Sequence, residues 1–203
     1  PRQMWKLDPF GGSALSATIA AQQRFDAVTK MRLPSELKGD LQASGDAELL
    51  WRPAFNEAGG VADSVPPQLL HVLTSYSGLT NQGFDFDQYR VATPPINDST
   101  VEARSQALAS YAQLWSTYFS RSSGGRLLAL PYGGDFRWQN ASYWYRNMTL
   151  LMTHVNAAAD SNSSRFGIRL RWATPSEYFH ALHSARGGAG GRAGGVGSDA
   201  LHS

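Results

Sequence analysis

The chain has no cysteine among its 203 residues, which excludes disulfides and thiolate metal sites within these residues. It also has no run of like charges: 18 lysines and arginines are scattered among 16 aspartates and glutamates, and the net charge is +2. This balance gives no support to nucleic-acid or anionic-membrane binding. No apolar stretch approaches the roughly 20 residues that span a bilayer, and no signal peptide is visible. With 42% hydrophobic and 11% aromatic residues, the composition is that of a globular protein.

Compartment is indicated by four Asn-x-Ser/Thr triplets, at Asn97, Asn140, Asn147 and Asn162. Such triplets are acceptors for N-glycosylation and favour a secretory-pathway chain, although a chain rich in Ser and Asn also generates them by chance. Asn147 falls within an aromatic helical run and is not expected to be modified. The chain begins at Pro1 already running into a strand, which predicts that it is an internal fragment.

The first fifty residues predict alternating strands and helices. Residues 4–8 (MWKLD) are typical of a short strand, residues 13–24 of a helix, and FDAVTKMR at 25–32 of a second strand. A strand, a Gly turn, a helix and a strand within some thirty residues form a βαβ unit, which implies a parallel sheet. ELLWRP at 48–53 predicts a further strand, and 69–76 either a strand or a helix end.

The second half of the chain predicts longer helices. Ser99 is the expected N-cap of a long amphipathic helix, and a second helix is expected at 143–159. GGRLLALPYGGDF at 124–136 resembles the opening, with an apolar strand, a Gly pair and an aspartate, and FGIRLRWAT at 166–174 predicts a last strand before a short helix at 175–182. Residues 184–203 are Gly-rich and expected to be disordered, so the predicted domain covers 1–183.

Two aspartates carry the chemistry that the sequence suggests. Asp8 and Asp135 each come after an apolar run and neighbour a Gly pair. In a parallel sheet with right-handed crossovers, strand ends at one edge converge, so both carboxylates could face one cleft. Two carboxylates across a pocket are the minimal equipment for glycoside hydrolysis. The alternative is that both are turn residues that hydrogen-bond their own backbone.

Several motifs resemble one known family. PRQMWKLDPFGGS, ELLWRP, GGDFRW and ATPSEYF occur in this order. Together they resemble glycoside hydrolase family 38, the class II α-mannosidases of the Golgi and lysosome, from Pro1 to Leu182. The resemblance implies an α/β fold in which this chain forms part of a (β/α) barrel with mainly parallel strands. It also implies an internal fragment of the N-terminal catalytic domain.

The resemblance assigns roles to five residues. Asp8 corresponds to the catalytic nucleophile, which also binds the zinc ion of the family, and Asp135 to the general acid/base. Phe10, Arg32 and Tyr76 correspond to substrate-binding residues. As alternatives from the residues alone, Phe10 is a core side chain, Arg32 a solvated charge at a strand end, and Tyr76 a packing residue.

The implied function is removal of terminal α-linked mannose from N-glycans and other oligosaccharides, with retention of configuration. The remaining zinc ligands would lie outside this chain, and the usual histidine of DPFGHS is Gly12 here. Two alternatives stay open, a glycan-binding module without zinc and an inactive pseudoenzyme fragment. The expected partners are mannose-containing glycans, in the lysosome or vacuole, the Golgi or outside the cell, and the sequence leaves the oligomeric state unknown.

Overall fold

The computed structural model describes residues 2–13, 15–51, 68–73, 75, 78–86, 93–122, 126–161 and 165–189. Its centre is a four-stranded sheet with strand order β1-β2-β4-β3. The strands are β1 (Gln3–Lys6), β2 (Ala27–Lys30), β3 (Glu48–Trp51) and β4 (Gln68–Val72). β1, β2 and β4 run parallel, and β3 runs antiparallel to β4. The predicted βαβ unit is therefore confirmed.

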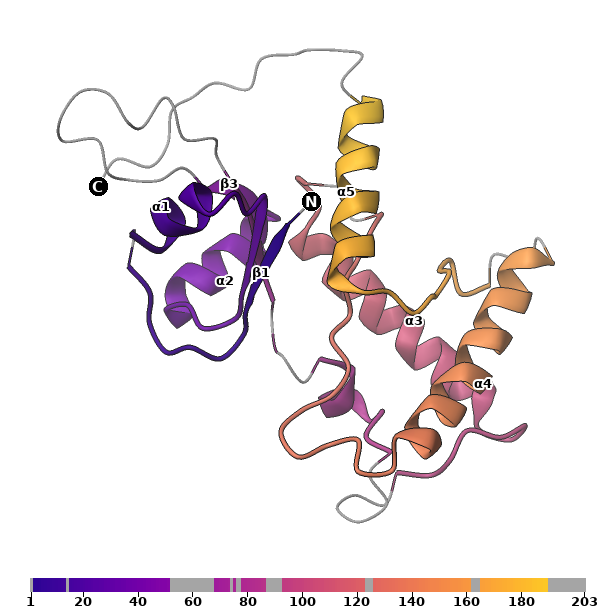
Figure 1. Ribbon diagram of the computed structural model, residues 1–203. Helices are drawn as coiled ribbons and strands as arrows, with labels where there is room; N and C mark the ends of the chain where they lie inside the picture. Colours follow the sequence, from indigo (N-terminus) through magenta and orange to yellow (C-terminus); the bar gives the residue numbers. More distant parts are fainter. Residues whose placement is uncertain are drawn as a thin grey trace, which may run out of the picture.

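Helices cover both faces of the sheet, as Figure 1 shows. Helix α1 (Leu15–Gln22) contributes Ala20 to a core that includes Val28 and Leu70. Helix α5 (Pro175–Ala189) packs Phe179 and Leu182 on the other face, against residues of β2 and β4. Covered on both sides, β2 and β4 are buried at every position, as expected of central strands in a parallel sheet.

Helix α2 (Ser35–Ser44) has no counterpart among the sequence predictions. It begins after Pro34 and ends at Gly45, which adopts the left-handed conformation at φ 79°. The N–H groups of Gly45 and Asp46 bond back to the carbonyls of Gln42 and Leu41. A Cβ at residue 45 would also collide with the Ser120 side chain, so this helix end needs glycine for two reasons.

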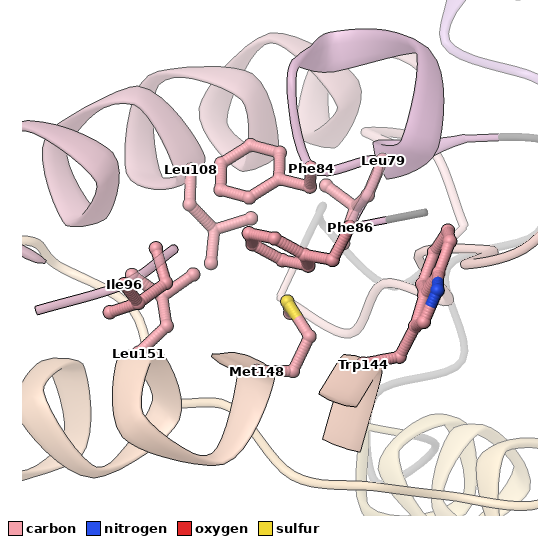
Figure 2. Close-up of a cluster of buried hydrophobic side chains, with 8 residues drawn as sticks. All are labelled: Leu79, Phe84, Phe86, Ile96, Leu108, Trp144, Met148 and Leu151. Carbon is pink, nitrogen blue, oxygen red and sulfur yellow. The ribbon is translucent and has the colours of Figure 1, made fainter. Parts of the chain in front are cut away.

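A second core lies between the long helices α3 (Val101–Tyr118) and α4 (Ala141–Asp160), beside the short helix η1 (Leu79–Gln82). Figure 2 shows its buried side chains: Leu79, Phe84, Phe86, Ile96, Leu108, Trp144, Met148 and Leu151. Both long helices were predicted from sequence. The expected N-cap is wrong by one residue, since Thr100 precedes the first turn and Ser99 instead bonds to the Asn97 side chain.

The strand expected within 124–136 is wrong for the described residues. Residues 126–131 do not form a strand. Next to them, Tyr132 forms one isolated antiparallel bridge with Gly78. The apolar pattern was real: Leu127 packs on the α5 side of the sheet and Leu128 on the opposite side. The apolar side chains of this segment are therefore packed against the cores although its backbone does not pair with a strand. A periodic sequence pattern predicts which side chains are buried, but it does not predict strand pairing.

The strand expected at 166–174 is also wrong. Its backbone is held by a side chain, because the Asn156 amide donates to the Leu170 carbonyl at 2.9 Å and accepts from the Leu170 N–H at 2.9 Å. The fold is thus mixed α/β with a small, mostly parallel sheet, and the view that this sheet is part of a (β/α) barrel stays a prediction.

Helix α5 also corrects the expected tail, because it continues to Ala189, inside the 184–203 segment predicted to be disordered. Residues 190–203 lie outside the described part of the chain. Among the helices that the structure describes, none is both long and apolar enough to cross a bilayer.

Candidate active site

The parallel strands bring their carboxyl ends to one edge of the sheet. Lys6, the last residue of β1, is in register with Lys30, the last residue of β2. Asp8 and Arg32 each lie two residues beyond these partners, so the strand register alone places them side by side. In open α/β sheets this edge is where ligands bind.

Arg32 holds the Asp8 carboxylate directly. Its Nε and Nη2 donate to Oδ1 of Asp8 at 2.8 and 2.5 Å. The Asp8 side chain remains 59% exposed and that of Arg32 35%. An ion pair this open contributes only about 0–1 kcal/mol to stability, so its main effect is to orient the carboxylate.

Phe10 completes a group that we call the Asp8 cluster, made of Asp8, Phe10 and Arg32. The Arg32 guanidinium lies 4.3 Å from the centroid of the Phe10 ring, within cation–π distance. Phe10 is 80% exposed, which excludes the alternative that it is a core residue. The structure therefore brings together three of the five residues predicted from sequence, and presents a carboxylate and an aromatic ring to solvent.

Lys30 occupies the space next to Gly12, the position where the resembling family has histidine. The Lys30 ammonium lies where a Cβ on residue 12 would be, and approaches the Gly11 carbonyl at 3.5 Å. Burial, with a smaller effect of Lys6, lowers the pKa of Lys30. The Lys30 ammonium, which was not predicted as a site residue, thus lies in the space that a histidine side chain at residue 12 would enter.

Asp135 lies in a loop that the Thr80 side chain holds in place through Gly133. The Thr80 hydroxyl donates to the Gly133 carbonyl at 2.5 Å and accepts from the Gly133 N–H at 3.0 Å. Asp135 is exposed, and Phe136 after it adopts φ 58°, a left-handed conformation that bulky residues rarely take. Such outliers collect at functional sites because the surrounding structure must hold them.

A buried ion pair, not predicted from sequence, supports the same loop. Arg137 lies 2.9 Å from Asp85, whose side chain is only 7% exposed. Burial, followed by the Asp85 charge, raises the pKa of nearby Tyr132 well above its ordinary value, which keeps the phenol neutral. The acidic-aromatic run GFDFD, which contains Asp85, was the available sequence signal.

Tyr76, the fifth predicted residue, lies outside the described residues. The structure also bears on the predicted zinc site. In the described part of the chain no group of three or more His, Cys, Asp or Glu side chains could hold a metal ion. Asp8, already bonded to Arg32, is one carboxylate, whereas zinc sites need three or four protein ligands. These residues alone do not fit a zinc site.

A carboxylate, a guanidinium and an exposed aromatic ring thus lie together at the carboxyl edge of the parallel strands. The chain belongs to the glycosyl hydrolases: the model of the family "Glycosyl hydrolases family 38 N-terminal domain" matches residues 1–198.

Curated relatives agree with this assignment. "Alpha-mannosidase B" of Dictyostelium discoideum is 30% identical over 91% of this chain and 19% of its own length. "Lysosomal alpha-mannosidase" of the same organism is 29% identical over 91% of this chain and 17% of its own. "Epididymis-specific alpha-mannosidase" of Homo sapiens is 25% identical over 91% and 19%. The chain thus spans about a fifth of these relatives.

Proposed function

We propose that this chain is part of the catalytic domain of a retaining α-mannosidase that removes terminal α-linked mannose from N-glycans and related oligosaccharides. The observation that carries the proposal is the Asp8 cluster, where the carboxylate is oriented by Arg32 beside an exposed ring. Family membership and the names of the relatives supply the substrate class. A secretory-pathway location, in the lysosome or vacuole, the Golgi or outside the cell, belongs to the same proposal.

In this mechanism the Asp8 carboxylate attacks the anomeric carbon and forms a glycosyl ester, while Asp135 donates a proton to the departing oxygen. Asp135 then takes a proton from water, which hydrolyses the ester with retained configuration. A retaining enzyme needs the two carboxyl groups about 5 Å apart. Arg32 orients the nucleophile, and Phe10 offers an apolar face to the sugar, with Tyr76 as a further contact.

Zinc remains part of the proposal only for a longer polypeptide. Asp8 would supply one ligand there, and the others would come from outside the described residues. Bound zinc would orient the substrate hydroxyls as a Lewis acid.

The alternative is a glycan-binding or inactive fragment. It is favoured by Gly12, which stands where the resembling family has histidine.

The test is hydrolysis of an aryl α-mannoside by the full-length protein, compared with Asp8→Asn and Asp135→Ala. Asp8→Asn should abolish turnover, by at least about 10³-fold, because it removes the nucleophile. Asp135→Ala should lose about 10²–10⁴-fold on natural glycans, and much less on substrates with good leaving groups that need no proton. Unchanged turnover in Asp8→Asn would refute the nucleophile, and equal losses on both substrates in Asp135→Ala would refute the acid/base role.

A further inference from the structure

Helices α2 and α3 form the walls of a groove that we call the α2–α3 groove. The α2 wall consists of Ser35, Lys38, Gly39 and Gln42. The α3 wall consists of Tyr111, Leu114, Trp115 and Tyr118. Steps of three and four residues place each set on one face of its helix. The groove has a volume of about 450 Å³, within the roughly 300–1,000 Å³ that small-molecule sites occupy.

Backbone contacts join the two walls at one end of the groove. The Arg121 N–H donates to the Gly45 carbonyl at 3.2 Å, and the Ala47 N–H donates to the Tyr118 carbonyl at 2.9 Å. Gly45 lies so close to α3 that a Cβ there would be 3.2 Å from the Thr117 carbonyl oxygen. These contacts hold the two walls at a defined spacing, so the groove is already formed in the free chain.

Gly39 lies in the middle of the α2 wall. Glycine inside a helix lowers stability relative to alanine, because it loses more backbone freedom on folding. Here the backbone of residue 39 is helical, and a Cβ would meet no atom within 4 Å. Neither the backbone nor the packing of the chain therefore requires glycine. A ligand that uses the space above residue 39 would explain it.

The polar side chains of the groove are within reach of a ligand. Asn81 and Gln82 of η1 line one end of the groove and are exposed, whereas Gln42, Tyr111 and Tyr118 are half-buried. Burial, followed by Tyr118, raises the pKa of Tyr111 to about 12, although its hydrogen bond with Gln82 opposes the shift. The Tyr111 phenol is thus neutral. Amides and neutral phenols both donate and accept hydrogen bonds, as sugar hydroxyls do.

The remaining lining residues favour a neutral ligand. Lys38 is the one charged residue among the described residues that line the groove, and its Nζ donates to the Met31 carbonyl at 3.1 Å. Because Met31 precedes Arg32, this end of the groove lies near the Asp8 cluster, although no residue of that cluster lines the groove. The Tyr111 ring packs against Trp115 with 4.8 Å between centroids, and gives the α3 wall an aromatic surface.

We infer that the α2–α3 groove is a saccharide-binding subsite, separate from the Asp8 cluster, which takes one or two neutral sugar rings. The sugar hydroxyls exchange hydrogen bonds with the amides of Gln42, Asn81 and Gln82. The apolar face of a ring lies on the Tyr111 side chain, in the space that Gly39 leaves open. The choice of a saccharide as the ligand rests on the proposed function.

The experiment follows the side-chain amides of Gln42, Asn81 and Gln82 by ¹H–¹⁵N correlation in the ¹⁵N-labelled full-length protein. An α-linked mannose disaccharide is titrated to about 50 mM, which covers dissociation constants in the millimolar range. We expect saturable shifts of these three amide signals. Their absence would overturn the inference. The same shifts on raising the protein concentration without sugar would mean that a second copy of the chain occupies the groove, and would also overturn it.

Gly39→Leu tests the groove without weakening the fold. Leucine is a better helix former than glycine, so the melting temperature should be unchanged or higher. Its side chain fills the space between the walls, and affinity for the disaccharide should fall at least about ten-fold. Asp40→Leu is the matched control, because Asp40 is the next residue of α2, is exposed and does not line the groove. Equal affinities in Gly39→Leu and Asp40→Leu would contradict the site.

Asn81→Ala tests one polar contact. It removes an exposed amide from the end of the groove and should weaken binding roughly five-fold, as for one lost hydrogen bond. Gln113→Ala is its control, because Gln113 is an exposed amide on α3 that does not line the groove. An unchanged affinity in Asn81→Ala, or an equal loss in Gln113→Ala, would contradict the assigned contact.

Asp8→Asn separates the α2–α3 groove from the proposed catalytic site. It should abolish hydrolysis and leave the titration of the groove amides unchanged. Loss of these shifts in Asp8→Asn would place the disaccharide at the Asp8 cluster, and would overturn the separate subsite. An intact titration in a parent protein that hydrolyses no α-mannoside would support the groove and count against the proposed function alone.

Discussion

Gly12 and Lys30 share one space, so their substitutions are coupled. Gly12→His on its own must displace the Lys30 ammonium, because the Cβ of residue 12 would overlap Nζ. We expect Gly12→His to lose about 1 kcal/mol of unfolding free energy, because residue 12 is exposed and the end of the Lys30 side chain can move aside at modest cost. The double variant Gly12→His with Lys30→Ala should recover most of it.

Urea denaturation of the two single variants and the double variant measures this coupling as a cycle. An interaction free energy near zero would mean that Lys30 moves aside without cost. Any gain in glycosidase activity of the double variant would show that the histidine position contributes to catalysis.

Glu48 makes stability depend on pH. Its folded pKa is lowered from 4.5 because the hydrogen bonds and charge of His71, with Ser122 and Tyr178, outweigh the cost of burial. A lowered carboxylate pKa contributes stability above the unfolded value, and that stability is lost as the pH falls through the folded pKa. We expect Glu48→Gln to be less stable by about 1–3 kcal/mol at pH 7, with the gap closing below pH 4.5.

Chemical denaturation of the parent chain and Glu48→Gln from pH 7 to the acid limit measures this gap. Glu36→Gln is the control, because Glu36 is exposed on α2. A gap that stays constant with pH would show that Glu48 is not ionised in the folded chain.

Among the elements, α4 is joined to the loop before α3 by one buried amide. Asn147 accepts from the Ile96 N–H at 2.7 Å and donates to the Tyr143 carbonyl at 2.8 Å. Because Asn147 is 2% exposed, glycosylation there would disrupt this contact, in agreement with the sequence expectation that it is unmodified. We expect Asn147→Ala to cost about 2–3 kcal/mol, because it leaves a buried N–H without a partner.

The matched variant is Asn140→Ala, which removes only the N-cap bond to the Tyr143 N–H and should cost about 1 kcal/mol. Urea unfolding of both variants checks the order. A smaller loss for Asn147→Ala than for Asn140→Ala would contradict the bridging role of the buried amide.

Elements differed in how well the sequence predicted them, for physical reasons. Short runs with apolar residues flank a Gly turn and a helical pattern at the start of the chain, so the βαβ unit of β1, α1 and β2 could be predicted. Helix α2 was missed because it has no buried residue and therefore no apolar stripe to detect. The two strands predicted in the second half failed because an apolar pattern specifies burial, whereas strand pairing needs a neighbour in space. Side-chain bonds from Asn156 replaced that neighbour for one of them.

The candidate site was likewise predicted in part, with some residues expected from sequence and others missed. Asp8, Phe10 and Arg32 came together because the register of two parallel strands fixes the positions of the residues just beyond their carboxyl ends. Lys30 and Asp85 were missed because their roles arise from contacts between distant segments. The catalytic roles of Asp8 and Asp135 stay predictions.

For the whole molecule, α3 is one connection between the two cores, and the segment from Leu128 to Tyr132 is another. Leu108, near its middle, lies in the cluster of Figure 2, and Phe119 after its last turn packs beside Val28 and Leu70 of the sheet. A single helix that enters both cores should make unfolding cooperative. We expect tryptophan fluorescence and circular dichroism to report one coincident transition.

Ala112, buried in this helix, provides the test. Ala112→Gly should lower stability by about 1 kcal/mol and keep a single transition, whereas Ala112→Pro, which costs about 3 kcal/mol or more, should separate the two signals. Coincident transitions in Ala112→Pro would show that the cores are coupled by contacts other than α3.

The antiparallel strand β3 also has a consequence for protein engineering. Trp51, its last residue, pairs with Gln68, the first residue of β4, at the edge of the sheet opposite Asp8. The connection between these two residues therefore starts and finishes far from the proposed chemistry. A fluorescent label attached at Trp51 would therefore report on the folded chain from the edge of the sheet opposite Asp8, and would be a practical handle for immobilising the protein in binding assays.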